Sequence, residues 1–229
     1  MQATPLLKSR SVQLLVALIV LILAYPFAEL LREPFGRVLS GVCTTLVLLA
    51  AVWSAADTRA QRIFASLLLA PSLILFWGEP LWAGRLVGVI IFCFYAIYQL
   101  LRRVMSPRIS MRDRIVVAMA VYLLAAMTFA FIHVTVWRID PTGYSTPNSI
   151  VPSEGRGTLD MLYFSLVTIL SVGYGDIVPV NGFAKMLTVI EAFAGAFFIA
   201  ILVARLVSLG PREDDSERER DLSGGMEDD

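Results

Sequence analysis

Long apolar runs joined by short polar links dominate this chain of 229 residues. Six runs reach or approach the roughly 20 residues that a helix needs to cross a hydrocarbon core of about 30 Å. They are Val12–Leu31, Val38–Ala56, Ile63–Trp77, Leu86–Leu101, Ile115–Trp137 and Met186–Val207. Because backbone polar groups in lipid must bond within the protein, such runs predict transmembrane helices. The third and fourth runs are the shortest of the six.

The composition agrees with a membrane protein and excludes an ordinary soluble domain. Charged residues make up 17% of the chain and apolar residues 57%, and the mean hydropathy is +0.73. A soluble domain has about a quarter of its residues charged. Nine of the nineteen acidic residues lie in the last seventeen positions. This concentration predicts a disordered cytoplasmic tail over 210–229.

The basic residues lie between the apolar runs, which argues against a nucleic-acid-binding surface. If the amino terminus is cytoplasmic, nine Lys and Arg fall on the inner segments before the tail and six on the outer ones. Since inner loops carry the excess of positive charge, this bias favours both termini in the cytoplasm and six spans.

One segment between the fifth and sixth runs is apolar but too short to span. Met161–Leu170 has ten residues, and the sequence Ser-Val-Gly-Tyr-Gly-Asp follows it at 171–176. Non-helical backbone at membrane depth is tolerated where it is buried in protein or lines a water-filled path. Glycine also adopts backbone angles closed to other residues, which lets successive carbonyl oxygens point to one side. The segment therefore predicts a helix that enters and stops, followed by a pore-lining strand.

This motif resembles the potassium channel signature Thr-Val-Gly-Tyr-Gly-Asp, with Ser171 in place of the Thr. The resemblance covers about Ile115–Leu209, less than half of the chain. It includes an outer helix, a pore helix with the aromatic pair Tyr163 and Phe164, the filter, and an inner helix with Gly195 at the hinge position.

The resemblance implies an all-α membrane protein of six transmembrane helices, with a re-entrant pore helix and a selectivity filter between the fifth and sixth. We expect a four-helix transmembrane bundle over 1–104, a pore domain over 105–209, and the acidic tail over 210–229. One pore loop supplies a quarter of a filter, so the resemblance also implies a homotetramer surrounded by membrane lipid.

The implied function is passive, potassium-selective conduction, with K⁺ as the permeant ion and no cofactor. Protein oxygens would replace the water around the ion. The residues implied to line the filter are Ser171, Val172, Gly173, Tyr174 and Gly175, of which the first four supply the K⁺ ligands.

Other residues are implied to support this filter. The filter supports are Asp176, Tyr163, Thr168 and Glu191, the gating hinge is Gly195, and the cavity residues are Ala196, Ile199 and Val203. We expect Tyr163 to donate a hydrogen bond to Asp176, although a solvated Asp176 is the simpler alternative. Glu191 is expected to bond Ser165 or Thr168. Each cavity residue has lipid-facing or interhelical packing as its alternative.

Other functional classes are open but less well supported. A weakly selective cation channel is the runner-up, because Ser171 lacks the methyl group that stiffens a threonine. A transporter should show matched broken helices in two halves, and neither half shows them. A non-conducting subunit is disfavoured by the intact glycines.

An intramembrane enzyme should bring polar side chains together within its spans. Here Glu29, His133 and Glu191 each stand alone in the sequence, so we expect no enzyme. We interpret His133, the single histidine, as a packing residue rather than a pH sensor.

A voltage sensor needs several basic residues inside the membrane field, whereas Leu86–Leu101 contains none. We therefore expect weak voltage dependence. The compact size and the lack of a eukaryotic targeting pattern predict a bacterial inner membrane.

Overall fold

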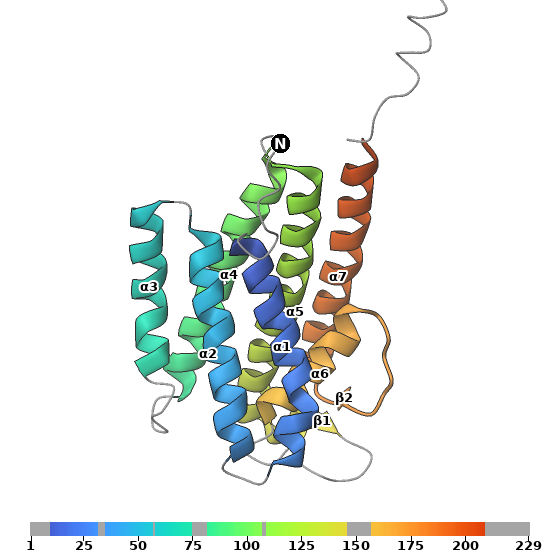
Figure 1. The fold of residues 1–229 in the computed structure, drawn as a ribbon. Helices are drawn as coiled ribbons and strands as arrows, with labels where there is room; N and C mark the ends of the chain where they lie inside the picture. The colour runs from blue at the N-terminus through green and yellow to red at the C-terminus, as the bar shows by residue number, and fades with distance from the viewer. Residues whose placement is uncertain are drawn as a thin grey trace, which may run out of the picture. The chain divides into compact units, whose positions relative to one another are not determined.

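The computed structural model describes residues 10–31, 35–56, 58–74, 82–106, 109–145 and 157–208. The described chain is mostly helical (Figure 1). The acidic tail predicted over 210–229 and the middle of the loop after the fifth apolar run lie outside these residues.

Each predicted apolar run is represented by a helix, in the order expected. The helices are α1 (Arg10–Leu30), α2 (Phe35–Ala55), α3 (Arg59–Ile74), α4 (Trp82–Met105), α5 (Met111–Ile139), α6 (Gly157–Ile169) and α7 (Gly182–Ser208). A 3₁₀ turn, Pro141–Gly143, follows α5.

Four of the described helices are long and apolar enough to cross a membrane by length and composition: α2, α4, α5 and α7. The fourth run, short in the sequence, forms the 24-residue helix α4. The described apolar part of α1 is shorter, Arg10–Ala24. Helix α3 has 16 residues, about 24 Å of helix. Six spans therefore stay a prediction.

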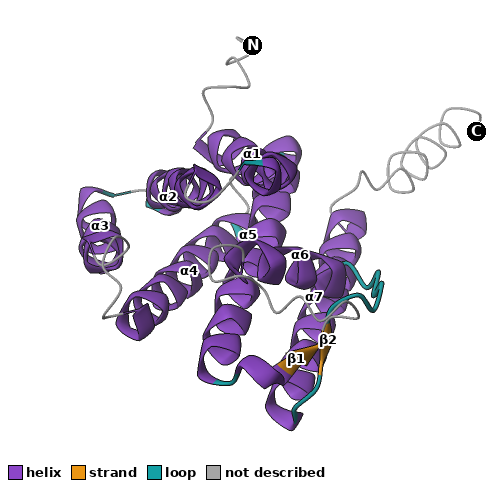
Figure 2. Cartoon of the chain, turned by 90° about the horizontal axis from the view of Figure 1, so that it is seen from below, coloured by secondary structure: helices purple, strands orange, loops and turns teal. Residues whose placement is uncertain are grey.

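The chain divides into two compact units, residues 1–196 and 197–229. In the first unit α5 contacts α1, α4 and α6, while α1 also packs on α2 and α3 on α4. Figure 2 shows α1, α2 and α3 nearly end-on and α4 obliquely. Fifteen of the 29 residues of α5 are buried, so α5 is the central helix of this unit. The described part of the second unit is the end of α7, residues 197–208. The predicted boundary at residue 104 stays a prediction.

A short strand pair departs from the all-helical expectation. Strand β1 (Tyr144–Ser145) pairs antiparallel with β2 (Val178–Pro179), so that Tyr144 lies opposite Pro179 and Ser145 opposite Val178. Two residues in each strand are too few for an alternating pattern to appear in a sequence. The pair joins the chain before α6 to the chain after the 171–176 segment.

Candidate functional site

Helix α6 is the short helix that the sequence predicts, and it has a defined end. It has 13 residues, about 20 Å of helix, which is too short to span a bilayer. After it, the Ser171 N–H donates to the Thr168 carbonyl and the Val172 N–H to the Val167 carbonyl, both at 2.9 Å. These two bonds form a Schellman cap, in which one residue adopts the left-handed conformation. That residue is Ser171, with φ of +56°.

The backbone alternates in handedness along the predicted filter. Ser171, Gly173 and Gly175 have φ of +56°, +61° and +77°, whereas Val172 and Tyr174 between them do not have positive φ. Such alternation turns successive carbonyl groups toward the same side of an extended strand, and glycine adopts it without steric cost. Serine has a Cβ, so its left-handed conformation costs about 1–2 kcal/mol. The glycines therefore occupy the positions that require them.

The predicted filter is exposed in the single chain. All six residues from Ser171 to Asp176 are exposed, and the Tyr174 side chain is 72% exposed. The whole segment is thus accessible to an ion or to another copy of the chain.

The outer end of this segment is attached to α6, as expected from the sequence. The Tyr163 hydroxyl donates to Asp176 Oδ2 at 2.6 Å, and Asp176 Oδ1 accepts from the Ile177 N–H at 3.0 Å. The bond to Asp176 raises the pKa of Tyr163 to about 12. Tyr163 therefore stays protonated, as a hydrogen-bond donor must, across the physiological pH range.

The carboxyl end of α6 is held by two other helices. The Tyr122 hydroxyl of α5 donates to the Ile169 carbonyl at 2.7 Å. From α7, Gly195 approaches the same carbonyl so closely that a Cβ atom at position 195 would collide with it. The close approach gives Gly195 a packing role, and its hinge role stays a prediction. The sequence analysis missed Tyr122, whose polar hydroxyl within an apolar run was the available signal.

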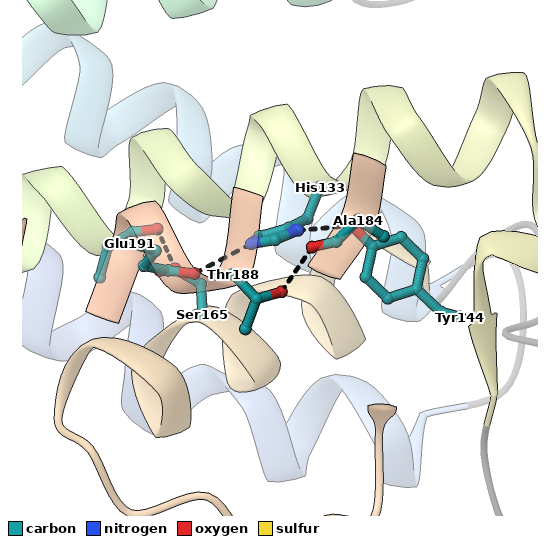
Figure 3. Close-up of polar contacts among 7 residues, drawn as sticks. His133, Tyr144, Ser165, Ala184, Thr188 and Glu191 are labelled. Carbon is teal, nitrogen blue, oxygen red and sulfur yellow. Dashed lines mark hydrogen bonds and ion pairs between the residues drawn. The ribbon is translucent and has the colours of Figure 1, made fainter. Parts of the chain in front are cut away.

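A buried polar network connects α5, α6, α7 and β1 (Figure 3). Ser165 bonds to Glu191 Oε1, which is one of the two contacts expected for Glu191. Glu191 Oε2 lies 2.9 Å from Nε2 of His133, and the other ring nitrogen, Nδ1, lies 2.5 Å from the Tyr144 hydroxyl. The expectation that His133 and Glu191 stand alone is therefore wrong. They are 58 residues apart in the chain, and hydropathy does not indicate which helices adjoin.

Phe164 encloses this network from α6. Its ring meets His133 edge-on with centroids 4.9 Å apart, and Tyr144 edge-on at 5.7 Å. Burial raises the pKa of the Tyr144 hydroxyl well above its ordinary value. Tyr144 thus keeps its proton and can donate a hydrogen bond.

A second polar link joins the end of α5 to the start of α7. Asp140 Oδ2 accepts from the Asn181 side chain at 2.7 Å, and Asn181 Oδ1 in turn accepts from the Ala184 N–H at 2.8 Å. Hydrogen bonds from Thr142 and then from Asn181 lower the pKa of the Asp140 carboxyl. The sequence analysis did not identify this link.

The roles of the remaining predicted site residues stay predictions. Ala196, Ile199 and Val203 are exposed, so their place in a cavity stays a prediction. Thr168 contributes its carbonyl to the cap of α6. The Glu29 side chain lies outside the described residues. Among those that are described, no group of three or more His, Cys, Asp or Glu residues is placed to hold a metal ion.

Comparison with known proteins gives a family model and several relatives that match part of the chain. A family model described as ion channel matches residues 115–210. Protein LctB of Bacillus caldotenax is 34% identical over 104 residues, which are 44% of this chain and 75% of LctB. LctB of Geobacillus stearothermophilus is 46% identical over 62 residues, 27% of this chain and 46% of that protein.

A plant protein also matches. Two-pore potassium channel 4 of Arabidopsis thaliana is 36% identical over 94 residues, which are 41% of this chain and 30% of the plant protein. The aligned part of the chain thus spans less than a third of that relative. The resemblance to potassium channels is confirmed at the level of the family. With three quarters of LctB covered at 34% identity, the chain belongs to the ion channel family, among relatives that include potassium channels, and is an integral membrane protein.

Proposed function

We propose that the protein is a passive, potassium-selective channel. The observation that carries the proposal is the alternation of positive φ at Ser171, Gly173 and Gly175, in a strand that follows a non-spanning helix. This backbone presents a row of carbonyl oxygens, which can replace the hydration shell of a dehydrated cation. The plant relatives are named as potassium channels, which supports K⁺ as that cation.

The chain acts as a homotetramer, because one filter strand lines only one side of a pore. The exposure of aromatic side chains in the single chain supports this assembly. Tyr174 is 72% exposed and Phe193 of α7 is 59% exposed in the single chain. Apolar and aromatic surface of this kind next to a filter suits the subunit contacts of a symmetric assembly.

The protein has six spans with both termini in the cytoplasm of a bacterium, and membrane lipid surrounds it. Opening does not depend on a voltage-sensor helix. The charge distribution between the apolar runs and the absence of basic residues from Leu86–Leu101 support these features.

The test is ion flux through the purified full chain in liposomes with opposed K⁺ and Na⁺ gradients. Two glycine variants form a matched pair. A Cβ atom at Gly173 or at Gly182 meets nothing within 4 Å, but Gly173 has a φ of +61°. Gly173→Ala therefore strains the filter backbone, and Gly182→Ala does not.

We expect barium-sensitive K⁺ flux that Gly173→Ala abolishes and Gly182→Ala preserves. Equal Na⁺ flux would replace the proposal with a weakly selective cation channel. Absence of flux from a folded tetramer, with potassium-loaded and sodium-loaded vesicles alike, would contradict passive conduction.

A further inference from the structure

Four polar side chains, one each from α5, α6, α7 and β1, meet in a buried cluster (Figure 3). Glu191, His133 and Ser165 are 0% exposed, and Tyr144 is 8% exposed. Glu191 is one of only three buried residues among the 27 of α7. Its protonation state therefore bears directly on how α7 is attached to the helices beside it.

The hydrogen bonds of Ser165 determine where the proton of Glu191 lies. The Ser165 hydroxyl lies 2.6 Å from the Ala126 carbonyl of α5 and also contacts Glu191 Oε1. A hydroxyl has one proton to donate, and a carbonyl has none. Ser165 therefore donates to Ala126, and the proton between Ser165 and Glu191 belongs to the carboxyl group.

The rest of the network fits this assignment. With its proton on Oε1, the carboxyl group accepts at Oε2 from the His133 Nε2–H, 2.9 Å away. Nδ1 of the neutral ring then accepts from the Tyr144 hydroxyl at 2.5 Å. Four contacts are served by four protons, and the buried cluster has no net charge, which a low-dielectric interior favours.

An ion pair between the same side chains satisfies fewer contacts. Protonated His133 would donate from both nitrogens, so that the Tyr144 proton would lose its acceptor in this network. An ionised Glu191 would have to share the single Ser165 proton with the Ala126 carbonyl. One of these two short contacts would then lack a proton of its own.

The elements α5, α6 and β1 each contribute polar groups that interact with Glu191. The titratable neighbours that interact with it are His133 and Tyr122 from α5 and Tyr144 from β1. Helix α6 contributes the Ser165 hydroxyl. His133 and the two phenols are uncharged in the arrangement above, so none of them supplies the positive charge that would favour an ionised Glu191.

We propose that Glu191 is a buried proton-binding site, occupied by one proton that joins α7 to α6. Removing that proton leaves a carboxylate that cannot donate to Ser165, and the attachment between the two helices weakens. Where the effect is on K⁺ flux, the proposal rests on the proposed function, and flux then declines as the solution becomes alkaline.

Infrared spectroscopy tests the proton without requiring conduction. Exposed carboxyl groups are ionised at neutral pH, so a carboxylic acid band from the full chain in bilayers reports a buried acid. We expect this band in the wild type at neutral pH and its loss in Glu191→Gln. A wild-type spectrum without the band overturns the proposal, whatever the flux assay shows.

Flux measured against pH tests the expected decline in alkaline solution. The amide of Glu191→Gln can donate to Ser165 and accept from His133, so we expect its flux to show no alkaline decline. Glu191→Ala removes both contacts and should lose at least about tenfold in flux or fail to assemble.

Thr188→Ala is the matched control, since Thr188 lies on α7 and bonds to Ala184 of its own helix at 2.8 Å. It should keep the alkaline decline of the wild type. An equal decline in Glu191→Gln and the wild type would overturn the proposal. If neither conducts while the infrared band is present, the proposed function fails and the proton site stands.

Discussion

The first four helices and the segment from α5 to α7 are held together in different ways. In the described part of α1 to α4, two long-range hydrogen bonds lie at one end of α2. There Arg10 donates to the Ala56 carbonyl at 3.2 Å and Arg103 to the Ser54 carbonyl at 3.1 Å. Such bonds use carbonyls that the end of a helix leaves free.

Between α5 and α7, by contrast, one group of polar contacts lies in the interior. His133, Ser165 and Glu191 are completely buried, and each bonds to another element. A buried polar group left without its partner costs about 1–3 kcal/mol. The second segment is therefore restricted to one arrangement, whereas apolar packing in the first tolerates small shifts between helices. We expect the second segment, which carries the predicted filter, to tolerate substitution less than the first.

The largest expected difference is in stability, between the substitution of one glycine in each region. In Gly195→Ala the new Cβ meets the Ile169 carbonyl, and in Gly84→Ala of α4 it meets nothing within 4 Å. Backbone cannot yield as a side chain does, so we expect Gly195→Ala to destabilise the folded protein by about 1–3 kcal/mol. Gly84→Ala should be neutral or stabilising by up to about 1 kcal/mol. Thermal unfolding of the two variants in detergent measures this, and equal stabilities would remove the contrast between the regions.

The substitution of one tyrosine in each region should give a smaller difference, in the rate at which conduction decays. Tyr163→Phe loses the bond to Asp176, and we expect conduction to decay about threefold to tenfold faster, in line with the net value of one hydrogen bond. Tyr98→Phe in α4 keeps the ring that faces the Arg102 guanidinium and should leave the decay unchanged. Ion preference should not change in either. The measurement is the time course of K⁺ current, and a Tyr163→Phe current as lasting as that of Tyr98→Phe would show that the bond does not support the filter.

The smallest effect concerns pH at the Asp140–Asn181 link. Because the pKa of Asp140 is lowered in the folded protein, the ionised carboxylate stabilises the link above the ordinary pKa of about 3.9. That stability is lost as pH falls through the lower folded-state value. The carboxyl is exposed to solvent, so the effect is small. We expect the protection factor of the Ala184 amide, which corrects the exchange rate for its intrinsic pH dependence, to fall by about threefold in acid, and Asp140→Asn to show no such fall. A wild-type protection factor that does not change in acid would contradict a stabilising role of the link.

The sequence predicts local features of the pore region well. The short helix, the two glycines at positive φ and the Tyr163–Asp176 bond all depend on residues within about twenty positions of one another. Glu191 was expected from helical spacing to bond Ser165 or Thr168, and it contacts Ser165, 26 residues away. Local spacing and one known motif were sufficient for these.

Contacts between distant elements could not be predicted in the same way. Tyr122 and His133 lie in a run whose residues nearly all read as apolar, and periodicity does not show which neighbour each one faces. The β1–β2 pair is too short to leave a pattern. For α1 to α4, the runs predicted helices, but nothing in their residues indicated how the helices pack against one another.

Two of the described helices are much longer than the hydrocarbon core of a bilayer is thick. Helices α5 and α7 have 29 and 27 residues, about 40 Å or more of helix each. The hydrocarbon core of a bilayer is about 30 Å thick, and helices longer than the core tilt. The thickness of the host membrane is thus a mechanical load on both of these long helices.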